Sequence, residues 1–182
     1  MTIDLSTINT TTVFTQAYNP DIQNRINALL TAALTCHAQV LLIRFDVRYP
    51  LGYIAPVDNS LFQQFIETYR RYLARHSFDP LYLWVREQNT SPNPHYHVVF
   101  LLDGTAIRFM PNLSHADELW ANVLGLPVGS KGLLHFCNPN GTMLRRDSES
   151  DATTAANYLS YLAKDYSKLP VKSVRMWGRS VL

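Results

Sequence analysis

The stretch from Leu81 to Leu102, LYLWVREQNTSPNPHYHVVFLL, decides the fold. It contains two runs with strand character, LYLWVREQ (81–88) and HYHVVFLL (95–102), separated by a polar link at 89–94. A link of this length and composition suits a hairpin with a loop longer than the tightest turns. The two runs are therefore predicted to pair as neighbouring antiparallel strands.

Helical and strand patterns alternate on both sides of this hairpin. Helices are predicted where apolar residues recur at helical spacing behind a capping residue, and strands where apolar and polar residues alternate. The predicted helices begin at Pro20, at Asp58, at Ser114 and at Ala152 (152–166), and the further strands cover 40–47 and 133–137. This order predicts an α+β domain with a mainly antiparallel sheet backed by helices. The sequence lacks GxGxxG and GxxxxGK[ST], which argues against Rossmann and P-loop enzymes.

Length and composition predict one folded domain spanning 1–182. Within it, 1–38 form an N-terminal arm and helix, and 167–182 form a basic C-terminal tail. The 47% share of hydrophobic residues excludes a disordered protein. No apolar run approaches the ~18 residues of a membrane span, and the polar start is not a signal peptide. We therefore expect a cytoplasmic protein in which Cys36 and Cys137 are reduced, buried thiols.

The net charge of +2 is too small to indicate a nucleic-acid binder by itself. Its distribution is uneven, because five basic residues follow Ala163 and Asp165 is the single acid among them. These five are Lys164, Lys168, Lys172, Arg175 and Arg179. A basic tail of this kind can hold phosphate, and it is also a common solubilising feature.

A candidate metal site lies in the predicted hairpin. His95 and His97 flank Tyr96, so both imidazoles face the same side of a strand. Glu87 in the preceding strand could add a carboxylate oxygen as the third ligand. Gln88 would be the alternative third ligand if a bulge shifts the register. Such a mixed site suits Mg²⁺ or Mn²⁺ bound to a phosphate, and Zn²⁺ also fits. The alternative is an ordinary pair of surface histidines.

A candidate nucleophile lies in the last predicted helix, NYLSYLAKDYSK. At ~100° per residue, Tyr166 falls on the core-facing stripe, Tyr158 at its border, and Tyr161 away from it. Lys164 follows about 60° beyond Tyr161 and could stabilise its phenolate. The alternative is that these tyrosines are ordinary residues of a half-buried helix.

Taken together, the chain resembles the HUH endonucleases, the superfamily of replication initiators and relaxases. The resemblance rests on PHYHVVFLL with its two histidines, on the acid in YLWVREQ, and on the YxxK of Tyr161 to Lys164. More narrowly, it is similar to the inovirus gene-2-type replication proteins and their prophage relatives with a YagK/YfjJ C-terminal domain. The segments VLLIRFDVRYP, ANYLSYLAKDYSK and VRMWGRS support this narrower match.

The resemblance implies a sheet of about five strands and a rolling-circle-type nickase of single-stranded DNA. Tyrosine attack would leave a 5′-phosphotyrosine link and a free 3′-OH, and the strands could be rejoined. Carried over to this sequence, His95, His97 and Glu87 become metal ligands. Tyr161 becomes the nucleophile with Lys164 as its helper. Tyr158 is the reserve, since it lies three residues from Tyr161 rather than the usual four.

The same resemblance implies an origin DNA as substrate, with a host helicase and polymerase as partners. Basic residues of the strand at 40–47 and of the tail could contact the DNA backbone, namely Arg44, Arg48, Lys168, Lys172, Arg175 and Arg179. Tyr82, Trp84 and Tyr96 are candidate platforms for unpaired bases, although core packing is the better interpretation of Trp84. The alternative function is a catalytically repurposed domain of the same fold that binds single-stranded nucleic acid.

Overall fold

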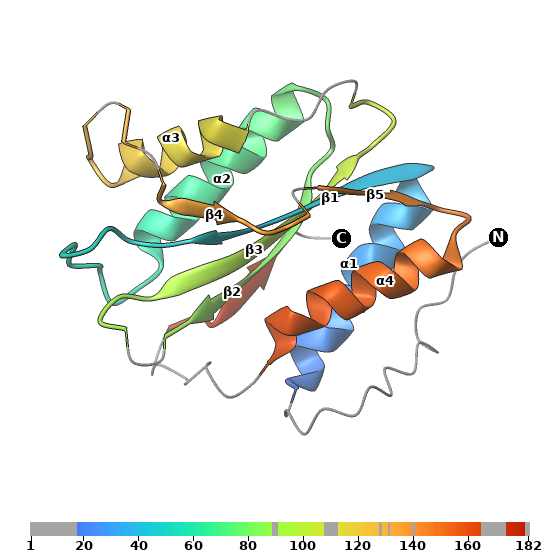
Figure 1. The fold of residues 1–182 in the computed structure, drawn as a ribbon, viewed down its shortest axis with the longest axis horizontal. Helices are drawn as coiled ribbons and strands as arrows, with labels where there is room; N and C mark the ends of the chain where they lie inside the picture. Colours follow the sequence, from blue (N-terminus) through green and yellow to red (C-terminus); the bar gives the residue numbers. More distant parts are fainter. Residues whose placement is uncertain are drawn as a thin grey trace.

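The protein, described here from a computed structural model, is a single α+β domain with an open antiparallel sheet and helices on both of its faces (Figure 1). The structure describes residues 18–88, 91–107, 113–127, 129–130, 132–139, 141–164 and 174–180. The predicted fold class is confirmed.

Four α-helices lie within the described ranges, the last of them followed by a short 3-10 turn. They are α1 (Pro20–Cys36), α2 (Ser60–Arg75), α3 (Leu113–Val123) and α4 (Glu149–Ser160), and the turn is η2 (Tyr161–Ala163). Asn19 caps α1 by accepting from the backbone N–H of Ile22 at 3.2 Å, with proline in the first turn. At α2 the capping position is Asn59 rather than the expected Asp58, whose carboxylate accepts from the backbone N–H of Ser60 at 3.0 Å.

The sheet has six strands in the order β4-β1-β3-β2-β6, with β5 also paired to β1. The strands are β1 (Gln39–Val47), β2 (Leu81–Glu87), β3 (His95–Asp103), β4 (Leu134–Phe136), β5 (Thr142–Arg145) and β6 (Trp177–Arg179). The predicted hairpin is confirmed as β2 and β3, and β3 lies at the centre between β1 and β2. The sequence analysis did not predict β5 and β6, which are too short to show a clear alternation.

The sheet buries both faces, because successive side chains along each strand point to opposite sides. Val40 and Leu42 of β1 pack under α1 and α4, in one apolar core. Ile43 and Phe45 of the same strand pack under α2 and α3, in a second core. Figure 1 shows the two helix pairs on opposite sides of the sheet. The protein is thus a three-layer structure with two separate cores.

Polar residues replace apolar ones at one end of the face under α1 and α4. Along β1 this face carries Val40 and Leu42, and then Arg44 and Asp46. Tyr158 near the end of α4 and Tyr161 in the following turn lie over Arg44, and the side chains of Arg44 and Asp46 are both largely buried. A polar patch is therefore left at the end of the core, beside the 3-10 turn that follows α4.

Two details of the sequence analysis were wrong here. The last helix was predicted at 152–166, but α4 begins at Glu149 and ends at Ser160, and Tyr161 lies in η2. We attribute the early end of the helix to a long-range contact. The backbone N–H of Asn19 donates a hydrogen bond to the carbonyl oxygen of Ala163 at 2.7 Å. Lys164 likewise forms an isolated bridge with Tyr18.

The second error concerns the expected burial of the two cysteines and the expected exposure of Tyr96. Cys36 is exposed and Cys137 is half-buried, and both are free thiols. Tyr96 is fully buried, and its ring stacks on Phe62 with centroids 3.7 Å apart. Tyr96 is therefore a core residue rather than a platform for bases, and Trp84 is buried as expected. Within the described ranges, no helix is both long and apolar enough to cross a membrane.

The contact of β6 with the sheet can be tested at Gly178. A Cβ at this position would lie 2.7 Å from the indole atoms of Trp84. We therefore expect Gly178→Ala to lower the free energy of unfolding by roughly 1–3 kcal/mol, measured by urea denaturation. In a Trp84→Phe background the crowded indole atoms are gone, so the same change should cost clearly less. Equal costs in both backgrounds would contradict the packing described.

Candidate metal site and nucleophile

The two histidines and the glutamate predicted as metal ligands come together on one face of the central hairpin. Glu87 of β2 lies opposite His95 of β3, and His97 lies two residues further along the same strand. One ligand atom from each of the three lies within 4.8 Å of the others. The rings of His95 and His97 are edge to face, with centroids 4.9 Å apart. The hairpin register therefore places three potential ligands around one point.

His97 is held from both sides by carboxylates. Its Nδ1 lies 2.6 Å from Oδ1 of Asp46, and its Nε2 lies 2.8 Å from Oε2 of Glu87. The side chain is almost fully buried at 3% exposure. Because a carboxylate oxygen only accepts hydrogen bonds, the two contacts favour the doubly protonated, cationic form of the imidazole.

The pKa values of the cluster follow from the same contacts. Burial alone would lower the pKa of His97, but the hydrogen bonds and charges of Asp46 and Glu87 outweigh it and raise the pKa above its usual value. Burial and the neighbouring charge of His97 lower the pKa of His95. Burial raises the pKa of Asp46, but the bond and charge of His97 more than offset this, and the net shift is downward. The pKa values of the two histidines are thus shifted in opposite directions although the two side chains share one face.

Asp46 is a site residue that the sequence analysis missed. It lies on β1, directly opposite His97 across the β1–β3 pair. A carboxylate on Nδ1 fixes the orientation of the ring and leaves Nε2 to face Glu87 and a metal. The available signal was that Arg44 and Asp46 interrupt an otherwise apolar run, on the side opposite Phe45 and Val47. Its partner depended on a strand pairing that is remote in sequence.

Glu87 rather than Gln88 accompanies the histidines. Gln88 accepts from Nη2 of Arg86 at 3.0 Å, and Arg86 in turn donates to Asn59 at 2.8 Å. Asn59 also accepts from the hydroxyl of Tyr96, so this second network lies on the α2 side of the sheet. The alternative ligand is thus bound to a separate group of residues, and the register needs no bulge.

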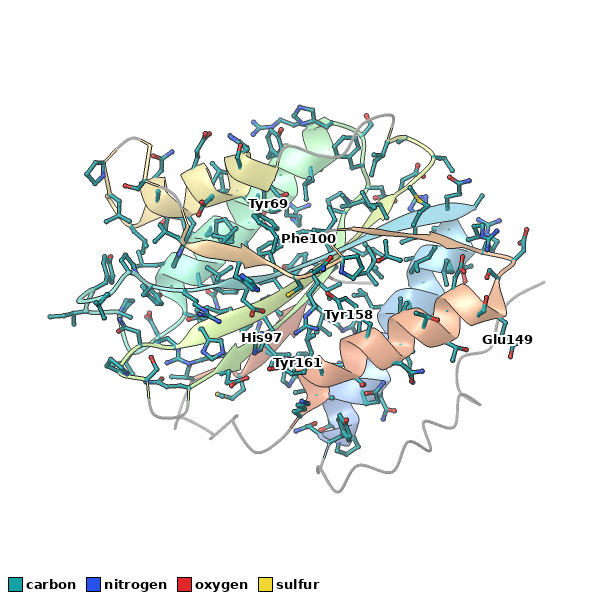
Figure 2. All side chains as sticks on the ribbon, viewed as in Figure 1. Tyr69, His97, Phe100, Glu149, Tyr158 and Tyr161 are labelled. Atoms are coloured by element: carbon teal, nitrogen blue, oxygen red, sulfur yellow. The ribbon has the colours of Figure 1, made fainter. Side chains whose placement is uncertain are left out.

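Tyr161 and Lys164 lie beside this cluster. The ring of Tyr161 stands perpendicular to the ring of His97, with centroids 5.5 Å apart (Figure 2). Nζ of Lys164 lies 4.2 Å from the centroid of the Tyr161 ring. Tyr161 is 38% exposed. The end of α4 and the contact of Ala163 in η2 with Asn19 therefore place an accessible phenol next to the potential ligands.

Tyr158 is placed differently, although it lies less than one helical turn away. Its hydroxyl oxygen is buried, and its ring packs against the core under α1 and α4. Burial, together with neighbouring Cys137, raises the pKa of its phenol despite the charge of Arg44. Of the two tyrosines, Tyr161 is the one whose side chain is exposed to solvent.

The basic residues expected to contact DNA occupy three different places. Arg48 is exposed, and its charge helps to lower the pKa of His95, so it lies near the cluster. Arg44 is only 7% exposed and lies under the two tyrosine rings. Arg175 and Arg179 belong to the segment around β6, which borders β2 at the sheet edge. Lys168 and Lys172 lie outside the described residues.

The donor set fits a divalent cation. Two imidazoles and one carboxylate are suitable ligands for Mg²⁺, Mn²⁺ or Zn²⁺, and three protein ligands leave positions open for a substrate. Asp46 contacts Nδ1 of His97, so it supports the ligand rather than joining the set. The cluster of Glu87, His95 and His97 is therefore a possible metal-binding triad.

Comparison with known proteins gives two matches. The model of the YagK/YfjJ C-terminal domain family matches residues 3–180. Among curated proteins, the chain is similar to "Uncharacterized protein YfjJ" of Escherichia coli (strain K12), with 24% identity over 194 residues that cover 87% of this chain and 92% of that protein. The match thus extends over nearly the whole domain described above.

Metal binding should release a proton from His97. Its raised pKa favours a protonated Nε2, and a metal ligated there must displace that proton. We expect the affinity for Mn²⁺ to rise with pH, by up to about tenfold per pH unit, until the raised pKa is passed. Calorimetry in two buffers of different ionisation enthalpy measures the proton released.

A histidine outside the cluster serves as the control. His37→Ala removes an imidazole that pairs with Asp79 instead, so the release should remain unchanged. His97→Ala should abolish it. An affinity for Mn²⁺ that is independent of pH across this range would contradict the arrangement.

Proposed function

We propose a function for this chain on the premise that it belongs to the YagK/YfjJ C-terminal domain family. It is an HUH-type endonuclease that nicks single-stranded DNA at a replication origin. One observation carries the proposal. An accessible tyrosine, Tyr161, lies against His97 of a possible metal triad, with the ammonium of Lys164 over its ring. The family resemblance based on the two histidines and YxxK agrees with this arrangement.

The metal would be held by Glu87, His95 and His97. When bound, a divalent cation polarises a phosphate and neutralises charge on its oxygens. Mg²⁺ or Mn²⁺ is our choice, because a mixed histidine and carboxylate set with open positions suits a phosphate substrate. Asp46 holds Nδ1 of His97, which keeps the imidazole oriented toward Glu87.

Tyr161 supplies the nucleophile. Its phenolic oxygen forms a bond to phosphorus while the bond from phosphorus to the 3′ oxygen breaks. The phenol proton is lost and the leaving 3′ oxygen takes up a proton, so the products are a 5′-phosphotyrosine and a free 3′-OH. The phosphodiester energy is retained in the new ester, and the reverse attack rejoins the strand.

Lys164 and Arg48 have distinct roles in this proposal. A phenol with a pKa near 10 needs nearby positive charge to react at neutral pH. The ammonium of Lys164 over the ring of Tyr161 provides it. Arg48, which is exposed near His95, contacts the DNA backbone. The substrate strand would thus lie across the exposed end of the sheet between Arg48 and η2.

The 3′-OH end is suited to prime synthesis, so a host helicase and polymerase are the proposed partners. A bacterial cytoplasm is the corresponding location. The second candidate function is a domain that binds single-stranded nucleic acid without cleaving it. It shares the same surface and differs only in the chemistry of Tyr161.

Covalent adduct formation tests the proposal. We expect the protein, incubated with pooled single-stranded oligonucleotides and Mn²⁺, to form an adduct that peptide mass spectrometry locates on Tyr161. Tyr161→Phe and His97→Ala should each lower the yield by at least ~100-fold, since they remove the nucleophile and a metal ligand. EDTA should have the same effect.

Tyr158→Phe is the matched control, because its hydroxyl is buried. It should leave the adduct yield within about twofold of wild type, since no buried group can reach the phosphate. An adduct on Tyr158 would keep the function and overturn the assignment of the nucleophile. DNA and metal binding without any adduct would favour the repurposed binding domain.

A further inference from the structure

A buried cation lies directly beneath the two tyrosines. The guanidinium carbon of Arg44 is 4.6 Å from the ring centroid of Tyr161 and 5.1 Å from that of Tyr158. Arg44 belongs to β1, on the same face as Asp46, and only 7% of it is exposed. One guanidinium thus contacts both phenol rings from the sheet side.

Few other contacts of the described residues account for this arginine. Among the described residues, its buried Nε has no hydrogen-bond partner and no carboxylate forms an ion pair with it, although a side-chain hydrogen bond links Arg44 to Tyr158. Asp46 is near enough for Arg44 to help lower the pKa of that carboxyl, although burial and His97 have the larger effects. The ring faces of Tyr158 and Tyr161 are therefore the main described surroundings of a charge that is costly to bury.

Stacking of this kind fixes ring positions. A guanidinium is planar and weakly hydrated, so it can lie against aromatic faces while removed from water. Desolvated cation–π contacts are among the stronger ones of their class. Arg44 supports the sheet-side face of Tyr161, while His97 meets the same ring perpendicularly and Lys164 lies over it.

We propose that Arg44 is a positioning residue that holds the ring of Tyr161 against His97 for attack, and that it does not bind the DNA backbone. The inference rests on the proposed nicking function. It differs from the expectation drawn from the sequence, where Arg44 and Arg48 formed one track for phosphates. The structure divides them, with Arg48 exposed and Arg44 covered by the two rings.

Kinetics of adduct formation separate the two roles. A positioning residue affects the rate at saturating DNA, whereas a backbone contact affects the DNA concentration that gives half-saturation. We expect Arg44→Met to lower the saturated single-turnover rate by about 30-fold, in keeping with the loss of a desolvated cation–π contact. The half-saturating DNA concentration should stay within about twofold of wild type.

Two further variants are the controls. Arg48→Met removes an exposed arginine that directly follows the end of β1, and should raise the half-saturating concentration with little effect on the saturated rate. Arg44→Lys keeps the charge without the planar group, and should recover only part of the lost rate. A raised half-saturating concentration with an unchanged saturated rate in Arg44→Met would overturn the proposal.

A measurement that needs no DNA keeps this inference distinct from the nicking function. In NMR spectra of protein with isotope-labelled tyrosine rings, Tyr161→Phe identifies the signal of Tyr161. We expect Arg44→Met to shift that signal, and Arg48→Met to leave it unchanged. If Arg44→Met does not fold, Arg44→Lys takes its place. An unmoved signal overturns the role of Arg44, whereas a wild-type protein that forms no adduct overturns the nicking function.

Discussion

The site depends on one imidazole that is held between carboxylates from two different strands. His97 of β3 meets Asp46 of β1 on one side and Glu87 of β2 on the other. This is possible because β3 lies between β1 and β2 in the sheet. Removal of either carboxylate would leave a buried charge without its partner, which is costly. The pairing of the three strands therefore fixes the arrangement of the side chains on which the chemistry of the site depends.

The position of the site follows from how the sheet is covered. The core under α1 and α4 is apolar up to Leu42 on β1, and then gives way to Arg44 and Asp46. The helix α4 stops at Ser160, and the backbone contact between Asn19 and Ala163 holds the turn that follows. Figure 2 shows Tyr161 at this end of α4 near His97, with Glu149 at the other end. An accessible phenol thus lies where the apolar core ends.

Local patterns in the sequence predicted the hairpin and the face shared by His95 and His97. Alternation along a strand suffices for this, because it depends on neighbouring residues. The partner Asp46 could not be predicted in the same way, since it requires the pairing of β1 with β3, which brings together residues 51 positions apart in the sequence. The end of α4 was also missed, because helical periodicity continues past Ser160 while the contact with Asn19 ends the helix.

The central claim is that Glu87, His95 and His97 bind a divalent cation, which replaces the direct contact between His97 and Glu87. An anomalous difference map from crystals soaked in Mn²⁺ tests it most directly. The account predicts one strong peak bonded to Nε2 of His97, to His95 and to a carboxylate oxygen of Glu87, with Asp46 still on Nδ1. A map in which Glu87 still bonds to Nε2 of His97, with no peak at the triad, would contradict it.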